Sequence, residues 1–262
     1  MRLMFSIILH RLAFTFPTEC ITNGVPVRPG TIPYQAGIRS VNRLYRGSGA
    51  LISDRHVITA ADFLTTKDDV EVFLGAYIFL DELEPFRITI IVPSKSINMF
   101  NKYKPCAQFD NIALLSLPVA VEFNQYISPV SLPPIGDTNK RYDNHILTVS
   151  GWGVRRLTGG QFYAKALNAG TMVVKPLTQC ARFHFVKMGN ICLDSPNKTV
   201  PCFGDAGAPL VDTQANVLVG LATMQQACFL KDTQVHIDVR EYSEWIRNEM
   251  AINVPTNLSS SQ

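Results

Sequence analysis

Short runs of apolar and β-branched residues recur along most of the chain, and glycine, proline, asparagine and aspartate lie between them. Repeated short strands with such turns favour an antiparallel barrel or sandwich over alternating strands and helices. The pattern therefore predicts an all-β fold. The strand-like runs are 47–53, 56–60, 70–77, 86–92, 112–117, 145–153, 168–174, 209–212 and 217–224.

Residues 239–252 have a helical period instead. Apolar positions recur there at a spacing near 3.6, which predicts an amphipathic helix at the end of the domain. The stripe consists of Val239, Tyr242, Trp245, Ile246 and Met250. Residues 253–262 have the composition of a flexible tail, and the proline-rich segment 128–143 has that of a linker between two halves.

The N-terminus resembles a secretory signal. Arg2 precedes an apolar run, His10 and Arg11 interrupt it, and a small-x-small pattern ends at Cys20. The apolar part is too short to span a bilayer, and no other stretch is suited to a membrane helix. We therefore expect residues 1–20 to be a signal peptide and the protein to be secreted and extracellular, with no membrane partner. The alternatives are a cytosolic N-terminal strand and an inexact start of translation.

Composition narrows the function classes. Of 262 residues, 47% are apolar, which is enough for a core, and the net charge of +3 comes without a Lys/Arg cluster. A nucleic-acid partner is therefore not expected. Six cysteines fit an oxidising compartment, but their spacing matches no zinc pattern, so we expect no metal and no cofactor. Sequons at Asn197 and Asn257 are glycan acceptors if the chain is secreted.

Six segments carry a family resemblance, from Ile21 to about Ile252. They are ITNGVPVRPGTIPYQ, LISDRHVITAAD, FDNIALLSL, VSGWG, CFGDAGAPLV and VREYSEWI. In this order they resemble the mature start, the histidine segment, the aspartate segment, the tryptophan turn, the nucleophile loop and the closing helix of trypsin/chymotrypsin-like serine proteases. The resemblance implies one protease domain, 21–252, of two six-stranded antiparallel β-barrels with a C-terminal α-helix and a cleft between the barrels.

The resemblance assigns the three catalytic positions. Such enzymes use a serine nucleophile, a histidine base and a buried aspartate. Here Ala206 stands at the nucleophile position and Asp62 at the histidine position, while Asp110 is interpreted as the retained aspartate. A methyl group cannot attack a carbonyl, and an unperturbed aspartate, with a pKa of about 3.9, is a poor base near neutrality. We therefore predict that the protein is not an enzyme. Gly204 and the Ala206 amide still resemble an oxyanion hole.

The substrate-specificity pocket of the family is also expected to be filled. By resemblance, Val200 lies at its base, Gln234 replaces a pocket glycine, and the wall is formed by Thr223, Met224 and Gln225. Glutamine side chains would fill the space that a substrate side chain enters.

The resemblance also implies disulfides. It pairs Cys180 with Cys192 and Cys202 with Cys228, while Gly47 and Phe63 occupy both ends of the usual bridge beside the histidine.

Activation is left open. In the family, a cut before the first residue frees an amine that pairs with the aspartate preceding the nucleophile, here Ile21 and Asp205. Signal peptidase would make that cut if it cleaved after Cys20. If Cys20 is retained, it could bridge to Cys106; otherwise Cys106 is free or joins another chain.

The leading interpretation is a secreted protease homologue without peptidase activity that binds a protein partner, as an adaptor or cofactor in a protease pathway or as a decoy for an inhibitor. One alternative is a serine-type endopeptidase with residual or relocated activity, and another is a decaying duplicate without a selected role. An aspartic dyad of Asp62 and Asp110, or a metal held by them, is disfavoured. A dyad requires a symmetric approach around a water, and no histidine follows a ligand spacing.

Overall fold

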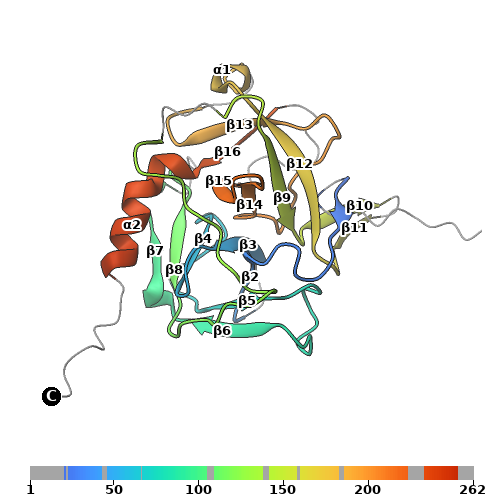
Figure 1. Ribbon diagram of the computed structural model, residues 1–262, viewed down its shortest axis with the longest axis vertical. Helices are drawn as coiled ribbons and strands as arrows, with labels where there is room; N and C mark the ends of the chain where they lie inside the picture. Colours follow the sequence, from blue (N-terminus) through green and yellow to red (C-terminus); the bar gives the residue numbers. More distant parts are fainter. Residues whose placement is uncertain are drawn as a thin grey trace, which may run out of the picture.

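The computed structural model describes residues 21, 23–42, 46–65, 67–104, 109–137, 142–157, 160–182, 186–223 and 233–252. Two antiparallel sheets lie against one another, and a helix lies at the edge of the first (Figure 1). The prediction of an all-β fold with two barrels and a C-terminal helix is confirmed. None of the helices in the described ranges has the length and apolar character that a bilayer crossing requires.

The first sheet has seven strands, one more than the six predicted, in the order β6-β5-β2-β3-β4-β8-β7. Its strands are β2 (Gln35–Ser40), β3 (Arg46–Leu51), β4 (His56–Thr59), β5 (Val70–Leu74), β6 (Ile88–Val92), β7 (Ile97–Met99) and β8 (Ala113–Ser116), with the 3-10 helix η1 (Ser94–Ser96) before β7. The hydrophobic pattern missed β2 because this strand carries Arg39. That side chain is buried and forms ion pairs with Glu71 of β5 and with Glu82.

The second sheet closes on itself. Strand β9 pairs with both β14 and β12, so six strands form a ring, as predicted, and the short β1 adds outside it through β12. The strands are β1 (Val25–Pro26), β9 (Ile146–Gly151), β12 (Asn168–Lys175), β13 (Asn190–Asp194), β14 (Pro209–Asp212), β15 (Val217–Leu221) and β16 (Gln234–Asp238). A separate hairpin pairs β10 (Val154–Leu157) with β11 (Gly160–Tyr163), and the short α1 (Leu177–Cys180) precedes β13.

The chain closes with the 3-10 helix η3 (Val239–Tyr242) and the helix α2 (Ser243–Ile252), where the 3.6-residue period predicted a helix. Ile246 is fully buried, and the Phe100 ring packs edge-on against Tyr242 and Trp245, with ring centroids 5.2 and 5.3 Å away. The C-terminal segment thus anchors to the first barrel, which is the contact visible beside β7 and β8 in Figure 1.

Polar contacts fix the two barrels to each other. The buried Trp152 donates its indole N–H to the Tyr77 carbonyl at 2.9 Å, and the Ser150 hydroxyl donates to the Gln35 side-chain oxygen at 2.6 Å. Each bond runs from the second barrel to the first. The loops that meet between the barrels therefore have a rigid frame.

Candidate functional site

The nucleophile loop, residues 202–208, runs into β14 and faces the first barrel. Ala206 is 1% exposed, and its carbonyl accepts a hydrogen bond from the Ser48 N–H of β3 at 2.8 Å. Two successive turns shape the loop, because the Asp205 N–H donates to the Cys202 carbonyl and the Ala208 N–H to the Asp205 carbonyl, both at 2.8 Å. Gly204 has a φ of 90°, a conformation that disfavours a side chain.

Asp205 is buried beneath this loop. Its carboxylate accepts the Gly153 N–H at 2.7 Å and the Cys202 N–H at 2.9 Å. Burial raises the pKa of Asp205 to about 7, and the two backbone donors and the charge of Arg46 oppose that rise. Gly153 has to be glycine, since an added Cβ would lie 2.1 Å from a carboxylate oxygen. Ile21 is fully buried in the apolar cluster of the second barrel. Pairing of a freed Ile21 amine with Asp205 stays a prediction, because it depends on cleavage.

The wall opposite the nucleophile loop follows β4. Asp62 accepts a hydrogen bond from Asn111 Nδ2 to Oδ2 at 2.8 Å, and Asn111 Oδ1 accepts the Ala61 N–H at 2.8 Å. Because Oδ1 faces a donor, the amide orientation of Asn111 is defined, and its NH2 group faces the Asp62 carboxylate. Asn111 is 1% exposed and lies directly before Ile112 and β8.

The interpretation of Asp110 as the partner of the Asp62 position is wrong. The Asp110 carboxylate accepts from Lys187 Nζ at 2.5 Å and from the Tyr242 hydroxyl at 3.0 Å, so it joins the first barrel to the second barrel and to η3. Asn111, the next residue, faces Asp62 instead. Asp110 lies in a turn with a φ of 56°, so its side chain leaves the backbone in a different direction from that of Asn111. Counting one residue back from the apolar run that begins at Ile112 would have found Asn111.

The two walls touch through Gly47 and Phe63. A Cβ added to Gly47 would lie 2.5 Å from the Phe63 ring and 2.8 Å from the Ala206 carbonyl. A Cβ on Gly207 would likewise meet the Thr59 hydroxyl at 2.1 Å. The structure thus brings the Asp62 segment and the Ala206 loop together, and the aromatic ring of Phe63 occupies the space above Gly47.

Two predicted pocket residues, Thr223 and Gln234, meet through His236, to which the sequence interpretation gave no role. The Thr223 N–H donates to His236 Nδ1 at 3.3 Å, and His236 Nε2 lies 3.1 Å from the Gln234 side-chain oxygen. These contacts fit an imidazole with its proton on Nε2. Gln234 and His236 are each 1% exposed and Val200 is also buried, so their side chains fill interior space. The signal for His236 was its spacing of two from Gln234, because alternate residues of a strand share a face.

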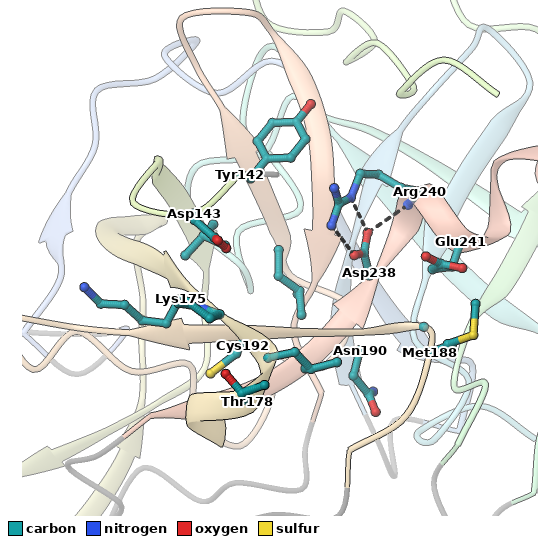
Figure 2. A pocket seen from close by; sticks show the side chains of 15 residues that line it. Tyr142, Asp143, Lys175, Thr178, Met188, Asn190, Cys192, Asp238, Arg240 and Glu241 are labelled. Atoms are coloured by element: carbon teal, nitrogen blue, oxygen red, sulfur yellow. Dashed lines mark hydrogen bonds and ion pairs between the residues drawn. The ribbon is translucent and has the colours of Figure 1, made fainter. Parts of the chain in front are cut away.

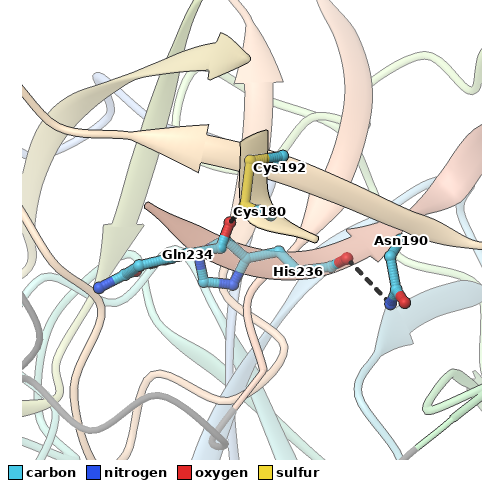
Figure 3. The surroundings of a disulfide bond; sticks show 5 residues. All are labelled: Cys180, Asn190, Cys192, Gln234 and His236. Atoms are coloured by element: carbon cyan, nitrogen blue, oxygen red, sulfur yellow. Dashed lines mark hydrogen bonds between the residues drawn. A yellow bond between two sulfur atoms is a disulfide. The ribbon is translucent and has the colours of Figure 1, made fainter. Parts of the chain in front are cut away.

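The disulfide between Cys180 and Cys192 is confirmed, with the two Cα atoms 5.7 Å apart. Figure 3 shows it beside β16, where the Cys180 sulfur lies 3.3 Å from the Gln234 carbonyl oxygen. Cys202 is also disulfide-bonded. Its predicted partner Cys228 lies outside the described residues, as do Met224, Gln225, Cys20, Cys106 and Asn257.

A groove of about 550 Å³ lies next to Asp62. Apolar and aromatic side chains line it, among them Leu64, Met99, Phe100 and Tyr103. A second cavity, of about 350 Å³, lies between β12, β13 and η3 (Figure 2). Two of the charged residues that line it form an ion pair: Arg240 Nε donates to Asp238 Oδ1 at 2.8 Å and Arg240 Nη2 donates to Asp238 Oδ2 at 2.5 Å. Within the described residues no three His, Cys, Asp or Glu side chains gather as metal ligands would.

Comparisons with known proteins agree with this architecture. The family model described as Trypsin matches residues 21–246. The chain is 27% identical to a collagenase of Hypoderma lineatum over 88% of each chain, and 28% identical to a chymotrypsin of Phaedon cochleariae over 88% of this chain and 82% of that one. The solved structure of HL collagenase superposes with a TM-score of 0.77 at 26% identity, covering 89% of this chain and 100% of that chain. A mutant of human heparin binding protein superposes with a TM-score of 0.75 at 24% identity, covering 90% and 99%, and shares the fold.

Proposed function

Since the chain belongs to the trypsin family of serine proteases, we propose that it is a secreted member without peptidase activity that acts by binding another protein. One observation carries the proposal: at the three positions where this family keeps serine, histidine and aspartate, the chain has Ala206, Asp62 and Asn111. This is one replacement more than the sequence interpretation counted, because Asn111 rather than Asp110 contacts Asp62.

Each replacement removes a chemical role. The Ala206 methyl has no lone pair with which to attack a carbonyl, so no acyl-enzyme can form. Asp62 lacks the second ring nitrogen through which a histidine passes a proton while its other nitrogen is held. Asn111 donates an amide N–H to Asp62, whereas the family's aspartate accepts one from the histidine. The hydrogen bond has therefore reversed its direction.

The interior beside the nucleophile loop supports the same proposal. Gln234 and His236 are buried, and His236 is hydrogen-bonded both to the Gln234 side chain and to the Thr223 N–H, so substrate entry would require this bonded chain of groups to move. A peptide side chain would have to replace those hydrogen bonds, and polar groups left unpaired in an interior are costly.

Binding and secretion have separate supports. Loops on a rigid pair of barrels are suited to recognition, and the fold also occurs in a protein named for binding heparin. The disulfides fit an oxidising compartment, and the names of the relatives include an insect collagenase and an insect chymotrypsin. We propose a protein partner, a protease or a protease inhibitor, toward which the chain acts as adaptor, cofactor or decoy.

The test compares the purified secreted protein with rebuilt variants. We expect no labelling of the wild type by a fluorophosphonate probe and no turnover of a peptide library. The triple variant Ala206→Ser/Asp62→His/Asn111→Asp is expected to label, and the double variant that keeps Asn111 to label far more slowly. Wild-type turnover that disappears in Asp62→Asn would instead establish a peptidase with relocated chemistry. If the double variant labels as fast as the triple variant, Asp110 rather than residue 111 orients the histidine introduced at position 62.

Secretion has its own measurement. Expression with residues 1–20 in a secreting cell is expected to release a protein whose N-terminal sequencing begins at Ile21. A product retained in the cytosol, or one that begins elsewhere, would contradict this part of the proposal and leave the catalytic part standing.

A further inference from the structure

An uncharged pocket lies where the two barrels meet and contains none of the residues of the candidate site. Its volume is about 350 Å³. Side chains from the entrance to β2, from β9 and β12, and from the β14–β15 turn line it, together with the segment that links the sheets. Those used below are Val27, Tyr34, Ser128, Thr148, Ala169 and Asn216. We call it the Tyr34 pocket.

The lining excludes ions as ligands. All of its residues are apolar, hydroxyl-bearing or amide-bearing, and none carries a charge at neutral pH. An ion transferred from water into such surroundings loses hydration without gaining a counter-charge. The Figure 2 cavity is the contrast, because Arg240, Asp238, Lys175 and Glu241 all line it. The Tyr34 pocket therefore selects a neutral molecule.

Tyr34 gives the pocket a hydrogen-bond donor. The side chain is 6% exposed, and desolvation by burial is the cause that raises the pKa of its hydroxyl, which therefore remains a neutral donor at physiological pH. This hydroxyl makes no hydrogen bond among the described residues, and its oxygen is not one of the fully enclosed polar atoms, whereas the hydroxyl of the buried Tyr242 donates to Asp110. The Tyr34 hydroxyl is therefore open to a molecule in the pocket and free to donate to an acceptor there.

Backbone hydrogen bonds hold the walls in place without a ligand. The Ser128 N–H donates to the Pro33 carbonyl at 3.0 Å, and the Ser131 N–H donates to the Asn216 carbonyl at 3.2 Å. On the opposite side, Thr148 and Ala169 lie in the paired strands β9 and β12. A preformed pocket binds without first ordering its walls, which favours affinity.

From these observations we propose that the Tyr34 pocket binds a small neutral molecule with an apolar body and one carbonyl oxygen that accepts a hydrogen bond from the Tyr34 hydroxyl. Val27, Ala169 and the methyl of Thr148 would contact the apolar body. The site does not depend on the proposed function, and its ligand would stabilise the contact between the barrels.

Acetophenone serves as the probe, with ethylbenzene as its counterpart without the carbonyl and benzoate as its anionic counterpart. In methyl-resolved NMR of the full chain, acetophenone is expected to shift the Val27, Thr148 and Ala169 methyl signals saturably, at about millimolar concentration, as is typical of a ligand of this size. Ethylbenzene should bind more weakly, and benzoate should not bind. Signals that stay in place up to the solubility of acetophenone would refute the proposal.

Tyr34→Phe isolates the hydrogen bond. It removes a hydroxyl that pairs with nothing among the described residues, so folding should be unaffected, while acetophenone affinity should fall about five- to tenfold and ethylbenzene affinity should not change. Tyr126→Phe, which lies outside the lining, is the matched control and should bind like wild type. Thr213→Trp, at the exposed turn, should occlude the pocket. Unchanged acetophenone affinity in Tyr34→Phe, or binding that survives Thr213→Trp, would place the probe elsewhere and refute the assignment.

Discussion

The nucleophile loop and the wall that faces it differ in the interactions that fix their shape. In residues 202–208 backbone hydrogen bonds form two turns, with a left-handed Gly204, a buried Asp205 and a methyl group as the side chain of residue 206. Across the cleft, Asp62 and Asn111 meet through their side chains. Backbone hydrogen bonds do not depend on the identity of one side chain, so the loop keeps its shape with any small residue at position 206, whereas a side-chain contact depends on both residues.

The same two walls differ in what stabilises them. The nucleophile loop is tied by the disulfide at Cys202, and Cys180–Cys192 braces the same barrel. The facing wall has Phe63 packed over Gly47 where the family resemblance predicted a missing bridge. An aromatic ring can fill the volume of a disulfide, but it stabilises the folded state by packing rather than by constraining the unfolded chain. Removing the Phe63 ring and removing a disulfide should therefore destabilise the protein by different mechanisms.

Phe63→Ala should have the largest effect. The ring is 6% exposed and fills the space above Gly47, so its loss should lower the free energy of unfolding by about 3–5 kcal/mol through lost burial and a cavity. Urea unfolding at neutral pH measures it. Phe203→Ala is the control from the other wall: its ring is 39% exposed, and a change below about 1 kcal/mol is expected. Equal losses in the two variants would refute the role given to Phe63.

Asp205 should make stability depend on pH. Its folded pKa of about 7 lies above the unfolded value of about 3.9, so the folded state binds the proton more tightly. The contribution of this group is therefore full at low pH and is lost as pH rises from 4 to 7, by roughly 4 kcal/mol at most.

Urea unfolding of wild type and Asp205→Asn at several pH values isolates this contribution, because all other groups are shared. The gap between the two curves should move steadily in favour of the variant as pH rises. A gap that stays constant would contradict it. A chain that starts at Ile21 sharpens the comparison, since a paired ammonium would lower the pKa of Asp205 and flatten the slope.

Asn111→Asp should destabilise by about 1–3 kcal/mol at neutral pH, because it places a second carboxylate against Asp62. Two adjacent carboxylates raise the pKa of one of them, so the loss should shrink as the solution is acidified below pH 4. Thermal unfolding at pH 3.5 and pH 7 measures this. Asp110→Asn is the control: it weakens an ion pair with Lys187 and should not create repulsion at Asp62. A loss for Asn111→Asp that is the same at both pH values would contradict the contact.

Asn197→Gln should have the smallest effect on stability, within about 0.5 kcal/mol, because Asn197 lies on an exposed turn. In the secreted protein it should remove one glycan, seen as a loss of mass that glycosidase treatment of the wild type reproduces. An unchanged mass would show that this sequon is not used.

The sequence predicted more of the overall fold than of the contacts in the candidate functional site. Runs such as 70–77 and 145–153 correctly predicted strands, and the Cys180–Cys192 pairing that the resemblance implied was correct. Strand β2 was missed because it contains the charged Arg39. The two residues that pair with Arg39 and permit its burial, Glu71 and Glu82, come from distant parts of the chain. His236 was missed because its role depends on Thr223, thirteen residues earlier in the chain, as well as on its neighbour in β16.

The amino-acid sequence determined the all-β architecture and the closing helix, and it predicted that Ala206 stands at the nucleophile position. These follow from the alternation of apolar residues, the turn residues and the order of the six motifs, which are local pattern and residue type alone. Only the tertiary structure decided that Asn111 faces Asp62 while Asp110 joins Lys187 and Tyr242, that Phe63 covers Gly47, and that Tyr34 is buried at a pocket between the barrels. The physical reason is that a side chain's partner depends on where distant parts of the chain lie, so even the adjacent residues Asp110 and Asn111 meet entirely different neighbours.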